Sequence, residues 1–356
     1  MSERAMATIR RIDKIEPIPN ADKIVLARVG GWQLVTAIAN GFKEGDLVVY
    51  CEIDSWIPTE VAPFLTKPGH TPKEYNGVKG EKLRTIRLRG QISQGLLLPC
   101  SIIPNFVEMM SDLEMVLGTA GAEEEIQKFD VSELLNIQKW EAPIPAQLAG
   151  TMKGNFPTQI PKTDQERIQN IHREFYEYKQ EGLSFEVTEK LEGSSMTCYL
   201  IDGVFGVCSR NIDLVRDENN SFWKQAIADD IEDKMRLIGV NFALQGELVG
   251  EGIQGNIYGL KGTYFYIYDV YDITNGEYLQ PHDRRRVVNA MMLNHVPVLQ
   301  PDFVLENETP ASLLALADGK TDLYPADVLR EGIVFKCNEK DVSFKAVSNL
   351  YLEGEK

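Results

Sequence analysis

Long apolar runs and cysteines are scarce in this sequence. No apolar stretch approaches the roughly 20 residues that a membrane-spanning helix needs, and the first five residues lack the apolar core of a secretory signal. The five cysteines among 356 residues have no paired close spacing, which disfavours a disulfide framework or a zinc site. The four histidines are equally dispersed. We therefore expect a cytoplasmic protein with reduced, buried thiols and no membrane association.

Basic residues are outnumbered, with 37 Lys and Arg against 53 Asp and Glu, giving a net charge of −16. This balance disfavours a protein that coats nucleic acid broadly, because such binding depends on counterions displaced by Lys and Arg. A nucleic-acid enzyme remains compatible with it if the basic residues converge on one groove. The 43% hydrophobic content is ordinary for a soluble globular protein, and the length allows two domains with separate cores.

The first part of the chain, residues 1–140, predicts a small β-barrel with a helical extension. Short strands separated by turn residues are expected at Ala7–Ile15, Ile24–Val29, Trp32–Ala37 and Leu47–Glu52. Gly30-Gly31 is a hairpin signal between two of them. Residues 105–140 are acidic and predicted to be helical. Prolines and glycines in residues 141–162 indicate a linker before a second domain at 163–356.

A basic strand is predicted at Lys82–Arg89. Its apolar residues keep to one face only if a bulge lies near Thr85. Arg87 and Arg89 would then share the open face, where they could contact nucleic acid. A solvated strand face explains the same pattern equally well.

The second domain mixes helices with antiparallel strands, so its fold class is α+β. Helices are predicted at Arg167–Tyr178, Asn219–Leu237, Asp283–Leu293 and Ala311–Leu316. The predicted strands are Ser184–Glu189, Met196–Ile201, Val204–Cys208, Phe242–Val249, Thr263–Tyr271, Gly332–Cys337 and Asp341–Val347.

An ordered series of short motifs runs through this second domain. It consists of Glu189-Lys190-Leu191-Glu192-Gly193, Ser209-Arg210-Asn211, Gly246-Glu247-Leu248, Tyr264–Asp269, Glu331–Lys336 and Ser343-Phe344-Lys345. Lys190 alone would be read as a surface lysine at a strand end. Glu247 stands in an apolar strand and needs a partner such as a ribose hydroxyl or a hydrated cation. Among the alternating tyrosines, Tyr268 is the one expected to stack on a purine, and an aromatic sheet core is the alternative.

The series resembles the covalent nucleotidyltransferase superfamily of ATP-dependent ligases and RNA capping enzymes, which is unrelated to ATP-grasp enzymes. The resemblance implies that Lys190 attacks the α-phosphorus of ATP and that Gly193 lets the backbone approach the ligand. It implies carboxylates at Glu247 and Glu331 for Mg²⁺ or Mn²⁺. The implied ATP-binding residues are Arg167, Glu189, Glu192, Gly193, Arg210, Glu247, Tyr268, Glu331, Lys336 and Lys345.

One departure from the superfamily pattern lies in the last motif. Relatives often carry Lys-x-Lys there, whereas this chain has Ser343-Phe344-Lys345. Any role of the first lysine is therefore in doubt here.

Domain order separates the subfamilies. Only eleven residues, 346–356, follow Lys345, so the accessory domain is expected to be the N-terminal barrel, whose segment Arg10–Val29 is similar to OB-fold modules. This arrangement resembles the Deinococcus- and Naegleria-type RNA ligases. The resemblance implies a monomer that joins RNA ends or seals nicked duplexes. A DNA ligase, a capping-type guanylyltransferase and a non-catalytic RNA-binding protein remain as alternatives.

Overall fold

The computed structural model describes residues 5–127, 129–141, 150–323 and 326–354. By contacts the chain divides into two compact units, residues 1–143 and residues 144–356. Of the predicted linker, residues 142–149 lie outside the described residues, and Met152–Asn155 forms a strand of the second unit. None of the helices in the described ranges has the length and apolar character that crossing a bilayer requires.

The first unit is built from short antiparallel strands and one helix. They are β1 (Ala7–Arg11), β2 (Lys14–Pro17), β3 (Ile24–Val29), β4 (Trp32–Ala37), β5 (Leu47–Cys51), β6 (Ser55–Pro58), β7 (Lys73–Tyr75), β8 (Val78–Lys82), β9 (Ile86–Leu88), β10 (Gln91–Ser93), β11 (Leu96–Pro99), α1 (Phe106–Ile126) and β12 (Gln138–Lys139). In the described residues they pair as β1-β5-β11, β2-β3-β4, β12-β6-β8-β7 and β10-β9.

The strand β5 is buried on both faces and separates two hydrophobic clusters. Val48 and Tyr50 pack with Trp32 and Leu34 of β4, whose burial alternates along the strand. Val49 and Cys51 pack on the other side, together with β1 and the end of α1. The strands β3 and β4 have the predicted bounds, and Gly30 and Gly31 between them have positive φ, as the hairpin requires.

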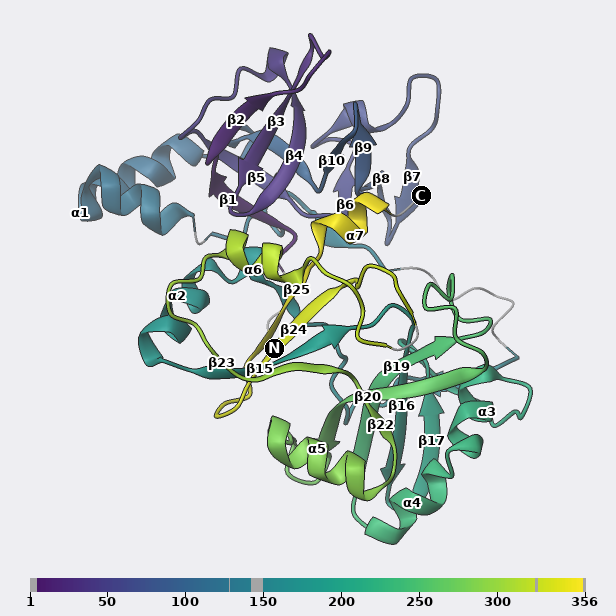
Figure 1. Cartoon of the computed structure of the whole chain (residues 1–356). Helices are drawn as coiled ribbons and strands as arrows, with labels where there is room; N and C mark the ends of the chain where they lie inside the picture. Colours follow the sequence, from purple (N-terminus) through teal and green to yellow (C-terminus); the bar gives the residue numbers. More distant parts are fainter. Residues whose placement is uncertain (1–4, 128, 142–149, 324–325, 355–356) are drawn as a thin grey trace. The chain divides into compact units, whose positions relative to one another are not determined.

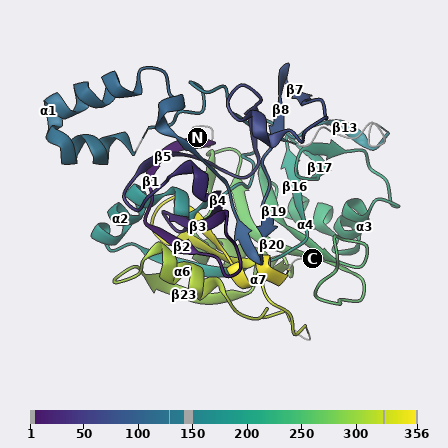
Figure 2. The ribbon, with the colours of Figure 1, turned by 90° about the horizontal axis from the view of Figure 1, so that it is seen from above.

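Two predictions for this unit are wrong in detail. The predicted strand Ala7–Ile15 is two strands, since β1 pairs with β5 and β2 pairs with β3. The predicted helical region 105–140 ends at Ile126, and α1 bends at Gly118, which has a φ of 71°. The two segments of α1 lie side by side and project from β1 and β5 (Figures 1 and 2).

The basic strand Lys82–Arg89 is also interrupted. β8 ends at Lys82, and β9 pairs with β10 in a separate hairpin. Ile86 and Leu88 are exposed, so the expected apolar face does not exist. Arg87 lies in β9, whereas Arg89 lies in the following turn with a φ of 50°. The two arginines therefore do not share a strand face.

The second unit contains the remaining helices and strands. They are β13 (Met152–Asn155), β14 (Glu166–Arg167), α2 (His172–Glu181), β15 (Ser184–Lys190), β16 (Ser194–Ile201), β17 (Val204–Cys208), β18 (Ile212–Leu214), α3 (Ser221–Ala228), α4 (Ile231–Ile238), β19 (Phe242–Gly250), β20 (Thr263–Asp272), β21 (Glu277–Tyr278), α5 (Pro281–Ala290), β22 (Asn294–His295), β23 (Val298–Val304), α6 (Pro310–Ala317), β24 (Gly332–Cys337), β25 (Ser343–Val347) and α7 (Asn349–Gly354).

Two sheets organise the described residues of this unit. The larger has the order β13-β18-β17-β16-β19-β20-β21, with β22 beside β20. The smaller has the order β14-β25-β24-β15-β23. Helices α3, α4 and α5 flank the larger sheet (Figure 1).

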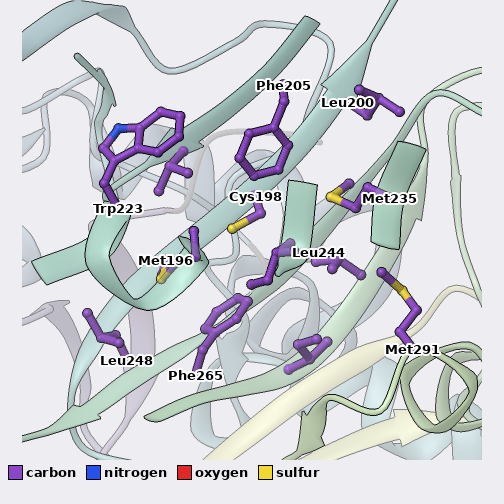
Figure 3. Close-up of a cluster of buried hydrophobic side chains, with 14 of the residues drawn as sticks. Met196, Cys198, Leu200, Phe205, Trp223, Met235, Leu244, Leu248, Phe265 and Met291 are labelled. Carbon is purple, nitrogen blue, oxygen red and sulfur yellow. The ribbon is translucent and has the colours of Figure 1, made fainter. Parts of the chain in front are cut away.

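One face of the larger sheet forms the main core. Met196, Cys198 and Leu200 of β16 point into it, together with Leu244 and Leu248 of β19 (Figure 3). Side chains from α3 and α4 close the cluster. Because strand side chains alternate between faces, the intervening residues of β16 and β19 face away from this core. Glu247 is one of these outward residues and pairs with Ser195 across the strands.

The helix predictions hold in outline and fail at boundaries. Arg167–Tyr178 is not one helix: Arg167 belongs to β14, and α2 begins at His172. Asn219–Leu237 is two helices, α3 and α4, separated at Asp230, whose φ is 51°. The α+β class and the closing strand pair β24 and β25 are confirmed.

Candidate active site

The smaller sheet has one apolar face and one face that gathers cations. Phe185 and Val187 of β15 pack into a cluster with α2 and α6. By alternation, Glu186, Thr188 and Lys190 face the other side. The strand therefore ends with Lys190 directed away from the apolar core.

The strand register places the other predicted phosphate-binding cations on the same face as Lys190. In β24, Val334 pairs with Thr188 and Lys336 pairs with Glu186. Lys345 of β25 pairs with Val334, and Arg167 of β14 pairs with Lys345. Lys190, Lys336, Lys345 and Arg167, which are far apart in sequence, thus share one sheet surface.

Lys190 forms an ion pair with Glu331. The distance between Lys190 Nζ and Glu331 Oε2 is 2.5 Å, and both side chains are largely covered, with 26% and 21% exposed. This contact follows from the register, because Lys190 pairs with Gly332 at the start of β24, directly after Glu331. The first and fifth motifs of the series therefore meet at the end of two neighbouring strands.

Gly193 joins the lysine turn to the larger sheet. It lies against Glu247, because a Cβ at this position would lie 3.0 Å from Glu247 Cγ. A Cβ at this position would lie 2.3 Å from Leu248 O, so only glycine allows the turn to rest on β19. The sequence prediction had assigned the glycine to close approach by a ligand, but the close approach that the structure contains is to a neighbouring strand.

The pKa of Glu247 is raised to about 7, mainly because burial disfavours its charged form. Lys190 and Arg210 act in the opposite direction, whereas the negative charge of Glu331 adds to the increase. Residues of the first, second and fifth motifs therefore act electrostatically on the Glu247 carboxylate of the third.

Glu192 has a carboxylate oxygen, Oε2, that is buried without a hydrogen-bond partner among the described residues. Its backbone N–H donates to the hydroxyl of Tyr258 at 2.7 Å. Sequence reasoning missed Tyr258, because a single aromatic residue in the glycine-rich segment 250–262 carries no periodic signal.

Tyr268 is the extra residue of a β-bulge. Gln245 pairs with Asp269 and Gly246 pairs with Ile267, so Tyr268 has no opposite residue on β19. Burial raises its pKa, and the side chains of Thr163 and Ser195 act in the opposite direction. Bulges re-aim side chains, which is why strand parity alone could not place this ring.

Lys336 is held in a buried ion pair with Asp269. Its ammonium also donates to Tyr268 O at 2.7 Å and lies 5.3 Å from the centre of the Tyr268 ring. Burial lowers the pKa of Lys336 to about 8, although Asp269 opposes this effect. The lysine is therefore tied to the backbone and ring of Tyr268, and its contact with a phosphate stays a prediction.

This pKa has a consequence for stability that can be measured with Lys336→Met. Between pH 8 and 10.5 the unfolded chain keeps the lysine proton while the folded protein releases it, so the unfolded state binds more protons. The free energy of unfolding of the wild type should therefore rise with pH relative to Lys336→Met, by on the order of 1 kcal/mol per pH unit. Urea unfolding at pH 8, 9 and 10 measures it. Lys224→Met, at an exposed position on α3, is the control, and parallel wild-type and Lys336→Met curves would refute the assignment.

Arg210 lies beside the site but is engaged elsewhere. It forms an ion pair with Asp164 at 2.6 Å and is 63% exposed. Both residues line a small hollow together with Ser195 and Thr197. To contact a nucleotide, Arg210 would have to break its ion pair with Asp164 and bind a group of the ligand instead.

Glu189 is separated from the other predicted residues. It lies on the opposite side of β15 from Lys190 and is 2% exposed. One of its carboxylate oxygens accepts from Thr321 Oγ1 at 2.5 Å, and the other accepts from Asp322 N–H at 2.8 Å. Its side chain thus connects β15 to the segment that contains Thr321 and Asp322. It does not point toward the face that carries Lys190 and the other cations.

Metal ligands are sparse. Within the described ranges, no three His, Cys, Asp or Glu side chains are grouped as a metal cage requires. Glu247 and Glu331 are the predicted metal ligands, and both surround Lys190. All five cysteines are buried free thiols, as expected.

Comparison with known proteins agrees with this geometry. A family model described as RNA ligase matches residues 183–347, and one described as an OB-fold domain matches residues 6–100. No curated protein matches the sequence.

Several solved structures of Naegleria gruberi RNA ligase are similar over the full length. A glutamate mutant with AMP and Mn is 43% identical, covers 99% of both chains and has a TM-score of 0.79. A lysine-to-methionine mutant with AMP and Mn is 42% identical over 99% of both chains, with a TM-score of 0.80. A lysine-to-alanine mutant with ATP and Mn is 42% identical, covers 98% of this chain and 99% of that chain, and has a TM-score of 0.78. The chain belongs to the family of RNA ligases that carry an N-terminal OB-fold domain.

Proposed function

We propose that this protein joins a 3′-hydroxyl RNA end to a 5′-phosphate RNA end, as in nick sealing, through a lysyl-AMP intermediate on Lys190. The observation that carries the proposal is the pairing of Lys190 with Glu331 on a sheet face that also bears Lys336, Lys345 and Arg167. A nucleophile among cations suits an attack on a polyphosphate, where negative charge develops on the leaving group.

In the first step the neutral amine of Lys190 attacks the α-phosphorus of ATP. A nitrogen–phosphorus bond forms, the bond to the bridging oxygen breaks, and pyrophosphate leaves. The amine must lose its proton, and Glu331 Oε2 lies at hydrogen-bonding distance to accept it. We assign Lys345 and Arg167 to the departing phosphates, because their register places them on the same surface.

Two features support a site for the adenosine. Tyr268 offers a ring re-aimed by a bulge, and the side chains of Ser195 and Thr163 act on the pKa of its hydroxyl. Arg210 is exposed next to the hollow and could exchange Asp164 for the ribose or a phosphate, since a guanidinium forms forked hydrogen bonds. The partnerless oxygen of Glu192 would accept from a ribose hydroxyl or an ordered water.

A divalent cation fits the donor set. Glu247 and Glu331 provide carboxylate oxygens, and hydrated Mg²⁺ or Mn²⁺ needs only one or two of them. When bound, the ion would supply positive charge beside the α-phosphate. The Naegleria gruberi structures with Mn and a nucleotide support this assignment.

The second and third steps transfer and release AMP. An oxygen of the 5′-phosphate RNA end attacks the lysyl-AMP phosphorus, which frees Lys190 and forms an RNA–adenylate. The 3′-hydroxyl then attacks the 5′-phosphate, forms the phosphodiester and expels AMP. Positioning and charge stabilisation are what the protein provides in these steps.

Sealing of a nicked duplex tests the proposal directly. Purified protein with ATP and Mn²⁺ or Mg²⁺ is expected to seal a nick whose 3′-hydroxyl strand is RNA, and strand combinations of RNA and DNA define the substrate. Sealing of all-DNA nicks in preference to RNA would contradict the proposed substrate. If the protein becomes labelled with AMP but seals no strand, only the adenylylation step of the proposal is supported.

The hairpin of β9 and β10 is the proposed RNA contact of the first unit. Arg87 and Arg89 are exposed there in an acidic protein, next to the exposed side chains of Ile86 and Leu88. Replacing both arginines with alanine should reduce nick sealing about tenfold, because two phosphate contacts are lost, and should leave self-adenylylation unchanged. Sealing kinetics at low and high salt measure the effect. The control is Lys23→Ala with Lys43→Ala, which removes two exposed charges elsewhere in the unit. Unchanged sealing by the arginine variant would remove the hairpin from the RNA path.

We also propose that the protein acts as a monomer in a reducing cytoplasm. The five buried free thiols support the reducing setting, because none is poised for a structural disulfide.

A further inference from the structure

The turn that follows the nucleophile is held at each of its residues. The Leu191 side chain is 4% exposed and packs with Val249 and Tyr258. The Glu192 N–H donates to Tyr258 Oη, and Gly193 lies so close to β19 that a Cβ there would be 2.3 Å from Leu248 O. Two of these restraints come from one residue, Tyr258, which has no place in the motif series.

Tyr258 is itself presented by an ordered loop between β19 and β20. Glu251 N–H donates to Gly262 O at 2.9 Å, which closes the base of the loop. The Asn256 side chain both donates to Leu260 O at 3.0 Å and accepts from Leu260 N–H at 3.2 Å. Tyr258 is 3% exposed, so its ring position is set by packing as well as by the loop.

The position of this hydroxyl bears directly on the reacting groups. It lies close enough to Glu189, Glu192 and Glu331 for their charges to act on it. Its hydrogen-bond partner is the backbone of the residue two positions after Lys190. A shift of that peptide would move the lysine on one side and the partnerless Glu192 carboxylate on the other.

We propose that Tyr258 is a positioning residue for AMP transfer, whose hydroxyl fixes the Glu192 peptide and thereby aims Lys190 and Glu192 at the nucleotide. This inference rests on the proposed function. A phenylalanine keeps the packing but provides no acceptor, so the Glu192 N–H in this partly closed site must turn to find another partner. Small misplacements of a nucleophile reduce the rate of attack more than they reduce binding.

The test is single-turnover transfer of label from α-labelled ATP to Tyr258→Phe at several ATP concentrations. The rate constant at saturating ATP should fall about tenfold, while the half-saturating ATP concentration stays within about twofold. Hydrogen exchange of the segment 190–196 should speed up in the variant, because the Glu192 amide loses its acceptor. The matched control is Tyr266→Phe, which removes a hydroxyl from the same hydrophobic cluster.

The outcomes distinguish a failure of the proposed ligase function from a failure of the positioning role of Tyr258. If the wild type accepts no label, the proposed function fails. If the wild type does and Tyr258→Phe transfers AMP at the wild-type rate, only the positioning role is overturned. A raised half-saturating ATP concentration with an unchanged saturating rate also overturns it. Should Tyr258→Phe lower the melting temperature, Tyr258→Leu provides a second variant, for which the same split between rate and half-saturation is expected.

Discussion

Lys190→Ala is expected to abolish formation of the lysyl-AMP intermediate and, with it, RNA sealing. The methyl group of alanine cannot form the nitrogen–phosphorus bond, and no described lysine occupies the same position beside Glu331. Label transfer from α-labelled ATP should fall by at least about a thousandfold. Intact-mass measurement of the wild type with ATP and a divalent ion should show an increase of about 329 Da, absent from the variant.

Two controls make this result specific. Lys179→Ala removes a lysine of α2 that donates to Glu308 O, and it should retain wild-type labelling. Label from α-labelled GTP should not accumulate on either protein. Stable labelling by GTP would point to guanylyl transfer, and an adduct that persists in Lys190→Ala would assign the nucleophile elsewhere.

Gly193→Ala is expected to damage both stability and activity. The added Cβ would lie 2.3 Å from Leu248 O and 2.8 Å from Val249 Cγ1, and the first of these is a backbone atom that cannot rotate away. The turn must lift from β19, which also moves it away from Glu247. We expect a loss of about 1–3 kcal/mol in the free energy of unfolding and at least about a hundredfold loss in the rate of AMP transfer.

Urea unfolding and single-turnover labelling measure these two effects. Gly154→Ala is the matched control, because its Cβ would meet no atom within 4 Å and its φ is not positive. Its unfolding free energy should stay within about 0.5 kcal/mol of the wild type. If Gly193→Ala were as stable and active as Gly154→Ala, the turn would not rest on β19 as described.

Local patterns in the sequence were sufficient for several strands. The strands β3 and β4 have the predicted bounds, and β24 and β25 form the predicted closing pair. The motif order also led to Lys190, Glu247 and Glu331 as proposed site residues. These features depend on residues near one another in the chain or on an ordered series, so they can be read without knowing the fold.

Boundaries set by competing partners could not be predicted in this way. Arg167 was expected on a helix, but strand pairing with β25 holds it in β14. The basic strand Lys82–Arg89 breaks because β8 and β9 pair in different sheets. In the first case a partner distant in sequence outweighs the local preference, and in the second the predicted strand is divided between two neighbouring hairpins.

By itself, the sequence determined the α+β class and the order of the motifs, because side-chain alternation and spacing are local properties, and the resemblance of that motif series is what led to Lys190 as the proposed nucleophile. Only the tertiary structure decided which way the site residues point. Glu189 turns to Thr321, Lys336 pairs with Asp269, and Tyr268 is re-aimed by a bulge. Each of these depends on how strands pair and pack in three dimensions, and a shift of one residue within a strand reverses the face on which a side chain lies.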